Sequence, residues 1–219
     1  MVGVCFFSPL ALTDTALDAL AVSEGVFECF GDGERERINK ISNPVGKALS
    51  LGGLIALRRA VSEFAPSEQT LTISRDKFGK PRFMCGEVEF SIAHAGGLSV
   101  AAISHGSIGV DIERIDSGRD TDRIAKRFFS EGEQKRLAAA DDRLREFYRI
   151  WTAKEAMMKR GGEGMVSIMT SDSARAEASG ECAFARYEIA FGGEIYILTV
   201  ATEDAEQIEL RLCEGVSVL

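Results

Sequence analysis

Apolar and polar residues alternate along residues 108–113, which read IGVDIE. In an extended strand successive side chains point to opposite faces, so the three apolar residues are expected to be buried together. Asp111 and Glu113 then share the other face with Gly109. Two carboxylates on one face repel each other, and no cation lies between them in the sequence. Either this face is solvated, as in many half-buried strands, or a cation such as a divalent metal ion reaches it from elsewhere.

Two longer stretches have apolar residues at helical spacing. The first begins after Asn43, a residue that favours the position before a helix, continues with Pro44 in the first turn, and ends before Pro66. The second begins after Asp141 or Asp142 and runs to about residue 160, where two glycines follow. The pattern therefore predicts two long helices, one before and one after the strand at 108–113.

Shorter elements fill most of the remaining chain. A helix is predicted over residues 14–22, and Ser130 and Glu133 have the spacing of a capping box that opens another helix. Residues 170–181 are polar and are expected to form a loop. The predicted strands cover residues 1–12, 71–74, 88–93, 98–104, 184–191, 195–201 and 208–213.

Composition narrows the class of protein. The 219 residues are long enough for one large or two small domains, and 45% apolar with 27% charged residues is typical of a globular chain. A net charge of −8 argues against a general nucleic-acid binder. The five cysteines show no paired spacing, so we expect neither a disulfide framework nor a zinc site, and the reduced cytosol fits best. The N-terminal stretch does not read as a signal peptide, and no apolar run is long enough to cross a membrane.

Several polar residues are candidates for binding or catalysis, each with an ordinary alternative. Lys47 lies in an apolar stretch, and the turn at residues 75–82 (RDKFGKPR) could hold an anion or be a solvated hairpin tip. His94, at the end of a predicted strand, could donate to a ligand or make a structural hydrogen bond. Glu155 and Lys159 are one helical turn apart and could be a surface ion pair.

Two runs together carry a resemblance to a known family. Residues 109–113 (GVDIE) and 151–159 (WTAKEAMMK), with 43 positions from Asp111 to Lys154, resemble the signature pair of the phosphopantetheinyl transferase superfamily. The similarity extends over about residues 30–170 and is greatest to the long, single-chain members that act on synthetase and acyl carrier domains. It includes residues 79–81 (GKP), 90–94 (FSIAH), 127–130 (RFFS) and 162–164 (GEG).

The resemblance implies an enzyme that moves the phosphopantetheine arm of coenzyme A to a serine of an apo acyl or peptidyl carrier protein and releases adenosine 3′,5′-bisphosphate. It implies an α+β fold with a pseudo-twofold arrangement of two similar halves, each a long helix packed on a small antiparallel sheet. Residues 1–106 would bind the nucleotide end of coenzyme A, and residues 107–219 would carry the magnesium and catalytic motifs. A cytoplasmic monomer is expected, with no nucleic-acid or membrane partner.

The resemblance also implies roles for individual residues. Mg²⁺ would be held by Asp111, Glu113 and Glu155. Glu155, or a water beside it, would take the serine proton, and Lys159 would face the phosphate oxygens. Asp111, Glu155 and Lys159 would thus be the catalytic residues. The residues that would contact coenzyme A are Lys47, Lys80, Pro81, Ser91, His94, Asp111, Lys154 and Lys159.

One segment departs from the pattern of the family. Many relatives read Ser-x-Ser-His-Ser where this chain has residues 91–95 (SIAHA), so two hydroxyl groups are replaced by methyl groups. We expect this change to affect the affinity for coenzyme A rather than the activity itself. Two alternatives remain open: a coenzyme A or carrier-protein binding module of the same fold without catalysis, and an unrelated Mg²⁺-dependent phosphohydrolase that uses Asp111 and Glu113.

Overall fold

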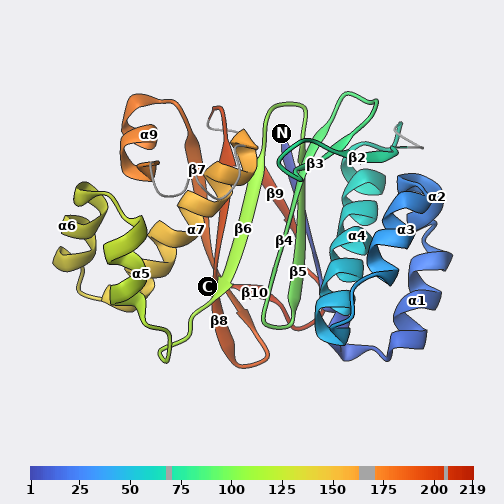
Figure 1. Ribbon diagram of the computed structural model, residues 1–219, viewed down its shortest axis with the longest axis horizontal. Helices are drawn as coiled ribbons and strands as arrows, with labels where there is room; N and C mark the ends of the chain where they lie inside the picture. Colours follow the sequence, from blue (N-terminus) through green and yellow to red (C-terminus); the bar gives the residue numbers. More distant parts are fainter. Residues whose placement is uncertain (68–70, 163–170, 205–206) are drawn as a thin grey trace. The chain divides into compact units, whose positions relative to one another are not determined.

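The computed structural model describes residues 1–219 except 68–70, 163–170 and 205–206 (Figure 1). The chain is a mixed α and β protein that divides into two compact units. The N-terminal unit comprises Met1–Gly106 and Gln207–Glu214, and the C-terminal unit comprises Ser107–Glu206 and Gly215–Leu219. Each unit has a four-stranded sheet and one long helix that packs on it.

The sheet of the N-terminal unit has the order β4-β5-β1-β9. β4, β5 and β1 are antiparallel neighbours, but β9 runs parallel to β1. β2 and β3 form a separate hairpin. The elements of this unit are β1 (Val2–Phe7), the 3-10 helix η1 (Pro9–Ala11), α1 (Asp14–Ser23), α2 (Val26–Phe30), α3 (Asp32–Asn39), α4 (Pro44–Phe64), β2 (Ile73–Arg75), β3 (Pro81–Phe83), β4 (Glu89–Ala95), β5 (Leu98–Ser104) and β9 (Ile208–Arg211).

The expectation of an antiparallel sheet in each half is therefore wrong for the N-terminal unit. The strand predicted over residues 208–213 was assigned to the C-terminal half, but it pairs with β1 in the N-terminal unit. Strand patterns in a sequence indicate which residues are extended, and they do not indicate which strand is the neighbour.

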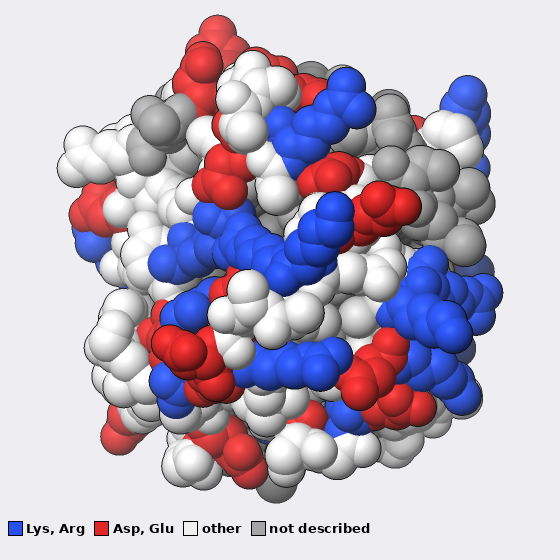
Figure 2. All heavy atoms as spheres, turned by 90° about the vertical axis from the view of Figure 1, so that its left-hand side faces the viewer, with Lys and Arg blue, Asp and Glu red and all other residues white. Residues whose placement is uncertain are grey.

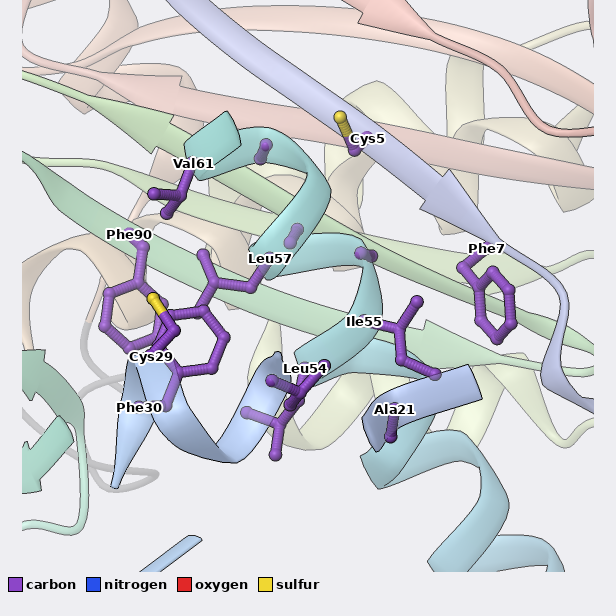
Figure 3. Packing of buried hydrophobic residues seen from close by; sticks show 14 of the residues in the cluster. Cys5, Phe7, Ala21, Cys29, Phe30, Leu54, Ile55, Leu57, Val61 and Phe90 are labelled. Atoms are coloured by element: carbon purple, nitrogen blue, oxygen red, sulfur yellow. The ribbon is translucent and has the colours of Figure 1, made fainter. Parts of the chain in front are cut away.

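α4 confirms the first predicted long helix. The side chain of Asn43 accepts hydrogen bonds from the amides of Val45 and Gly46, which satisfies two backbone donors at the start of the helix. The buried face of α4 contributes Leu54, Leu57 and other apolar residues to the core of the unit, where they pack with α1, α2 and the sheet (Figure 3). Removal of this apolar surface from water is the main stabilising contribution to the unit.

The sheet of the C-terminal unit has the order β10-β7-β8-β6, and all of its neighbours are antiparallel. α7 packs on β6 and β8. Ser130 and Glu133 form the predicted capping box, and Asp142 caps α7. The elements of this unit are β6 (Gly109–Arg114), α5 (Thr121–Phe128), α6 (Glu131–Ala139), α7 (Arg143–Gly161), α9 (Ser173–Ser179), β7 (Ala183–Phe191), β8 (Glu194–Thr202) and β10 (Ser217–Val218).

The polar stretch at residues 170–181 was expected to be a loop, and this prediction is wrong for most of it. Thr170 lies outside the described residues, but Ser173–Ser179 forms α9, which the side chain of Asp172 caps by accepting from the amide of Arg175. A helix of seven residues has too few apolar positions to show a helical period, and its small polar residues are equally common in loops.

Several charged side chains on the surface of the C-terminal unit form ion pairs. Arg149 contacts Glu188 at 2.8 Å, and Arg143 contacts Asp122 at 2.6 Å. On the face shown in Figure 2, Lys and Arg form several groups, each with Asp or Glu nearby. No helix within the described part of the chain is both long enough and apolar enough to span a bilayer.

Candidate active site

Gly109 allows α7 to approach β6 closely. A Cβ atom added to Gly109 would lie 1.9 Å from the carbonyl oxygen of Ala156 and 2.5 Å from the amide nitrogen of Arg160, both in α7. No side chain fits in that space. The face of β6 that carries Asp111 and Glu113 therefore lies beneath α7, and both faces of this strand are covered rather than one being solvated.

Asp111 is the most deeply buried acidic group on this strand, with 3% of its surface exposed. Its Oδ1 accepts a hydrogen bond from Nζ of Lys159 at 2.6 Å, whereas its Oδ2 has no hydrogen-bond partner among the residues that the structure describes. Burial is the main cause that raises the pKa of Asp111 to about 8; the nearby charge of Glu155 acts in the same direction and Lys159 opposes both. An unpartnered carboxylate oxygen in this position is suited to accept a cation or a proton.

Glu155 and Lys159 project from α7 towards Asp111. Burial raises the pKa of Glu155, and the charge of Glu113 adds to this effect. Burial alone would lower the pKa of Lys159, but the carboxylates of Asp111 and Glu155 outweigh it, so the pKa of Lys159 is raised. The predicted pair one turn apart on a helix is therefore not a surface ion pair but part of a buried cluster with β6.

Two groups hold the carboxylate of Glu113. The indole nitrogen of Trp151 donates to its Oε1 at 3.2 Å, and a guanidinium nitrogen of Arg119 lies 3.3 Å from the same oxygen. The guanidinium of Arg119 also lies over the rings of Trp151 and Tyr148, at 5.5 and 5.9 Å from the ring centroids. Glu113 is thus fixed from α7 and from the loop that follows β6.

Arg119 was not a candidate in the sequence. It lies in a short loop that the structure anchors to α7, because the hydroxyl of Tyr148 donates to the carbonyl of Asp116 and accepts from its amide. The run of Asp, Ser and Gly before Arg119 is a turn signal, but nothing in that signal indicates that the arginine folds back onto Glu113.

Lys154 does not belong to the cluster, in contrast to its expected contact with coenzyme A. Its side chain is fully buried, its Nζ lies 2.9 Å from Oε2 of Glu133, and it also donates to the carbonyl of Ser171. Glu133 in turn accepts from the amide and hydroxyl of Ser173 at 2.9 and 2.7 Å. Neighbouring helical residues point about 100° apart, so Lys154 and Glu155 face different surroundings.

The side chains around Asp111 carry the donor atoms of a site for a hard metal ion. Asp111, Glu113 and Glu155 offer only carboxylate oxygens, the ligands that Mg²⁺ prefers, and one oxygen of Asp111 has no partner. Within the described residues no three acidic, His or Cys groups already surround one point as metal ligands do, and the ammonium of Lys159 is the cation beside Asp111. The residue types fit a hard divalent ion.

The remaining candidates lie in the N-terminal unit. Ser91 and His94 are in β4, three residues apart and hence on opposite faces, with Ser91 buried and His94 exposed. His94 is opposite Ser99 in the sheet, and the hydroxyl of Ser99 donates to the carbonyl of Leu49 in α4 at 2.8 Å. His94 therefore lies on the face of the sheet that α4 covers, close to the first turns of that helix, where Lys47 is located.

The basic turn at residues 75–82 forms the tip of the β2–β3 hairpin, with Arg75 at the end of β2 and Pro81 at the start of β3. Two of its cations are paired with carboxylates, Arg75 with Glu34 at 2.9 Å and Arg82 with Glu89 at 3.0 Å. Lys80 is mostly buried, with its Nζ 4.0 Å from Glu89, and Pro81 begins β3. From Glu89 to the end of β4, where His94 lies, the strand rises about 16 Å.

Comparisons of the sequence with known proteins point to the same part of the chain. Residues 107–201, which include the whole carboxylate cluster, match a family model described as the 4′-phosphopantetheinyl transferase superfamily. A 4′-phosphopantetheinyl transferase of Bacillus subtilis is 29% identical over 74% of this chain and 71% of its own length.

Two further relatives have similar names. The transferase Sfp of Bacillus subtilis is 28% identical over 68% of this chain and 67% of its own length. The transferase AcpT of Salmonella typhimurium is 34% identical over 59% of this chain and 66% of its own length. The segment matched by the family model contains both signature runs, so the chain is similar to the 4′-phosphopantetheinyl transferase superfamily in the residues that form the cluster.

Proposed function

We propose that this chain transfers the 4′-phosphopantetheine arm of coenzyme A to a serine of an apo acyl or peptidyl carrier protein. The observation that carries the proposal is the cluster of the buried Asp111 with the partly buried Glu113, Glu155 and Lys159, which lies within the segment matched by the family model. The serine oxygen forms a bond to the phosphorus next to the pantetheine, and adenosine 3′,5′-bisphosphate leaves.

Asp111, Glu113 and Glu155 are the residues that hold Mg²⁺ in this proposal. When bound, the ion offsets the negative charge of the pyrophosphate and of the leaving group. Oδ2 of Asp111 has no hydrogen-bond partner among the described residues, and the pKa values of Asp111 and Glu155 are raised by burial. Both observations support this assignment, because a bound cation would stabilise the ionised form of these carboxylates. Trp151 and Arg119 hold the carboxylate of Glu113 in place through contacts to its Oε1.

Glu155 takes the proton of the attacking serine, directly or through a water molecule. A base works best when its pKa is near the working pH, and burial moves the pKa of Glu155 upwards from the range of an ordinary glutamate. The ammonium of Lys159 stays protonated, because the surrounding carboxylates raise its pKa. It faces the phosphate oxygens and stabilises the charge that develops on them.

Lys47, Lys80, Pro81, Ser91 and His94 bind the nucleotide end of coenzyme A in this proposal. His94 contacts the 3′-phosphate, and Lys47 and Lys80 provide further positive charge. His94 lies on the face of the sheet that α4 covers, close to the first turns of that helix, where Lys47 is located, and this supports a ligand shared by these two residues. Lys154 is not included, because its ammonium is used within the fold.

The chain acts as a monomer with internal pseudo-twofold symmetry in this proposal. The support is that each unit packs one long helix on a four-stranded sheet. A non-catalytic binding module of the same fold is not favoured, because each residue that the resemblance places in the metal and proton-transfer steps is present and lies in the cluster.

One assay tests the proposed function. The protein is incubated with Mg²⁺, coenzyme A and each of several apo carrier proteins, and the intact mass of the carrier is measured. We expect the carrier to gain the mass of one phosphopantetheine arm and adenosine 3′,5′-bisphosphate to appear in equal amount. A folded protein that modifies no carrier but binds coenzyme A is a binding module, and release of phosphopantetheine into water without a carrier indicates a phosphohydrolase.

A further inference from the structure

The N-terminal unit contains a second concave site, away from the residues assigned to coenzyme A. A cavity of about 470 Å³ lies between β1, the end of α1, the second half of α4 and the end of β9. Its volume is within the range of small-molecule sites. Arg58 of this cavity lies about 16 Å along α4 from Lys47. Its charged lining residues are Glu24, Arg58, Arg59, Glu63 and Arg211.

Positive charge exceeds negative charge in the lining. Three arginines and two glutamates border the cavity. Arg59 is paired with Glu24 at 2.6 Å, and Arg211 is paired with Glu63 at 2.9 Å. Two of the three guanidinium groups are thus neutralised by carboxylates that line the same cavity.

Arg58 is the remaining cation. Its Nε donates to the backbone carbonyl of Glu24 at 3.1 Å, and its Nη1 donates to the hydroxyl of Ser62 at 2.5 Å. Within the described part of the chain, no carboxylate forms an ion pair with it. These two neutral acceptors hold the guanidinium in place and leave its charge uncompensated at the cavity wall. A guanidinium in a fixed orientation is well suited to a carboxylate or phosphate group, which it binds through two parallel hydrogen bonds.

Neighbouring contacts also fix the other two arginines. The guanidinium of Arg59 lies 4.9 Å from the ring centroid of Phe7, and that of Arg211 lies 5.5 Å from that of Phe64. Long cationic side chains lose conformational freedom when they bind, so side chains that are already ordered bind an anion at lower entropic cost.

Apart from Ser62, the other lining residues are apolar or weakly polar: Cys5, Phe6, Leu212 and Cys213. Burial raises the pKa of the Cys5 thiol to about 12, and burial also raises the pKa of the Cys213 thiol. Both thiols are therefore protonated at neutral pH and form a weakly polar surface beside Leu212, rather than nucleophiles or metal ligands. The cavity thus combines one uncompensated cation with an apolar wall.

We propose that this cavity binds a small organic anion, a carboxylate or phosphate group on a short apolar body, with the anionic group on Arg58 and the apolar part beside Leu212. The proposal does not depend on transferase activity, because none of the lining residues belongs to the cluster around Asp111.

Calorimetry with the full chain tests the site. The probes are butyrate and butyl phosphate, with butanol and butylammonium as matched compounds without a negative charge. We expect at least one of the two anions to bind and both uncharged and cationic controls to fail. The anion that binds more tightly identifies the preferred head group. If neither anion binds, or if butanol binds as tightly as they do, the proposal is wrong.

Substitutions test whether the anion binds at Arg58. Arg58→Gln keeps much of the side chain and removes its charge, and we expect it to weaken binding of the anion about tenfold or more. Arg123→Gln removes an exposed cation of α5 and is the matched control, with unchanged affinity expected. Melting temperatures check that both variants are folded. If Arg58→Gln does not fold, Arg58→Lys takes its place: it keeps the charge but loses the two parallel hydrogen bonds of the guanidinium, and we expect it to weaken binding of the anion severalfold. Equal affinity of the folded variant and the original chain would overturn the proposal.

Discussion

The two long helices lie on sheets of the same number of strands, but they bury different kinds of side chain. The buried positions of α4 are all Gly, Ala, Val, Leu or Ile. The buried positions of α7 include Thr152 and Lys154, and α7 covers Asp111 on β6. The hydroxyls of Thr152 and Thr199 lie 2.7 Å apart between helix and sheet.

The two helices are therefore expected to contribute differently to stability and to function. An apolar interface stabilises a fold through burial alone, whereas a buried charge costs free energy unless its partner and hydrogen bonds are all in place. Asp111 keeps one oxygen without a partner, so its position beneath α7 is not explained by stability. We infer that α4 mainly holds its unit together, while α7 also holds groups that act on a substrate.

The largest expected effect is the loss of a carboxylate from the cluster. We expect Asp111→Ala and Glu155→Ala each to lower the rate of carrier modification about a thousandfold, a loss typical of removing a group that stabilises the transition state. The fold should persist, because each substitution removes one of several like charges from one face. Carrier mass and melting temperature are measured for both, with the exposed Asp141→Ala as control. Near-normal turnover of either variant would show that the assigned metal ligand is wrong.

Lys154 and Lys159, both in α7, are expected to contribute differently to the free energy of unfolding. Lys154→Met leaves the carboxylate of Glu133 buried without its cation, and we expect the free energy of unfolding to fall by about 3–5 kcal/mol. Lys159→Met should destabilise much less, because Asp111 already has a raised pKa and can take up a proton when its partner is lost. Urea unfolding measures both variants.

A second substitution provides the control for Lys154. Glu133→Gln in the Lys154→Met variant removes the unpaired charge and should restore part of the lost free energy of unfolding. If Lys154→Met were as stable as the original chain and lost only affinity for coenzyme A, the ion pair with Glu133 would not be its role.

The sequence predicted the parts of the cluster that follow from local geometry. Strand alternation placed Asp111 and Glu113 on one face, helical spacing placed Glu155 and Lys159 one turn apart, and the structure brings these residues together. Local geometry could not show that Lys154 turns away into a buried pair, because its partner Glu133 is 21 residues earlier in the chain. The position of β9 beside β1 was missed for the same reason.

The effect of pH follows from the carboxylates of the metal-free protein. Burial raises the pKa of Asp111 from 3.8 to about 8, so between these values the folded state keeps a proton that the unfolded state has lost. The free energy of unfolding should therefore fall as the pH rises from about 4 to about 8, and the raised pKa of Glu155 acts in the same direction. Chemical unfolding in the presence of a chelator measures this dependence. A fall of equal size in Asp111→Asn would show that other groups cause it.

Gly109 in β6, beneath α7, and Gly53 within α4 are expected to respond differently to substitution. Gly109→Ala places a methyl group against the backbone of α7, and we expect the free energy of unfolding to fall by about 2–3 kcal/mol. The added Cβ in Gly53→Ala meets only a methyl group of Ile92, at 2.7 Å, which can move, and alanine favours the helix. We therefore expect a much smaller change for Gly53→Ala. Similar losses in both variants would indicate that the two interfaces are equally tight.

The smallest expected effect is a change in the KM for coenzyme A with little change in kcat. Lys80→Ala and His94→Ala each remove a contact that forms with coenzyme A before the reaction begins, so we expect the KM for coenzyme A to rise about tenfold while kcat changes little. Lys77→Ala, at the exposed tip of the same hairpin, is the control and should change neither value. Steady-state kinetics with a saturating carrier measures both constants. A loss of kcat as large as that expected for Asp111→Ala would mean that residues of the N-terminal unit also act in the chemical step, and the division of roles between the two units would have to be abandoned.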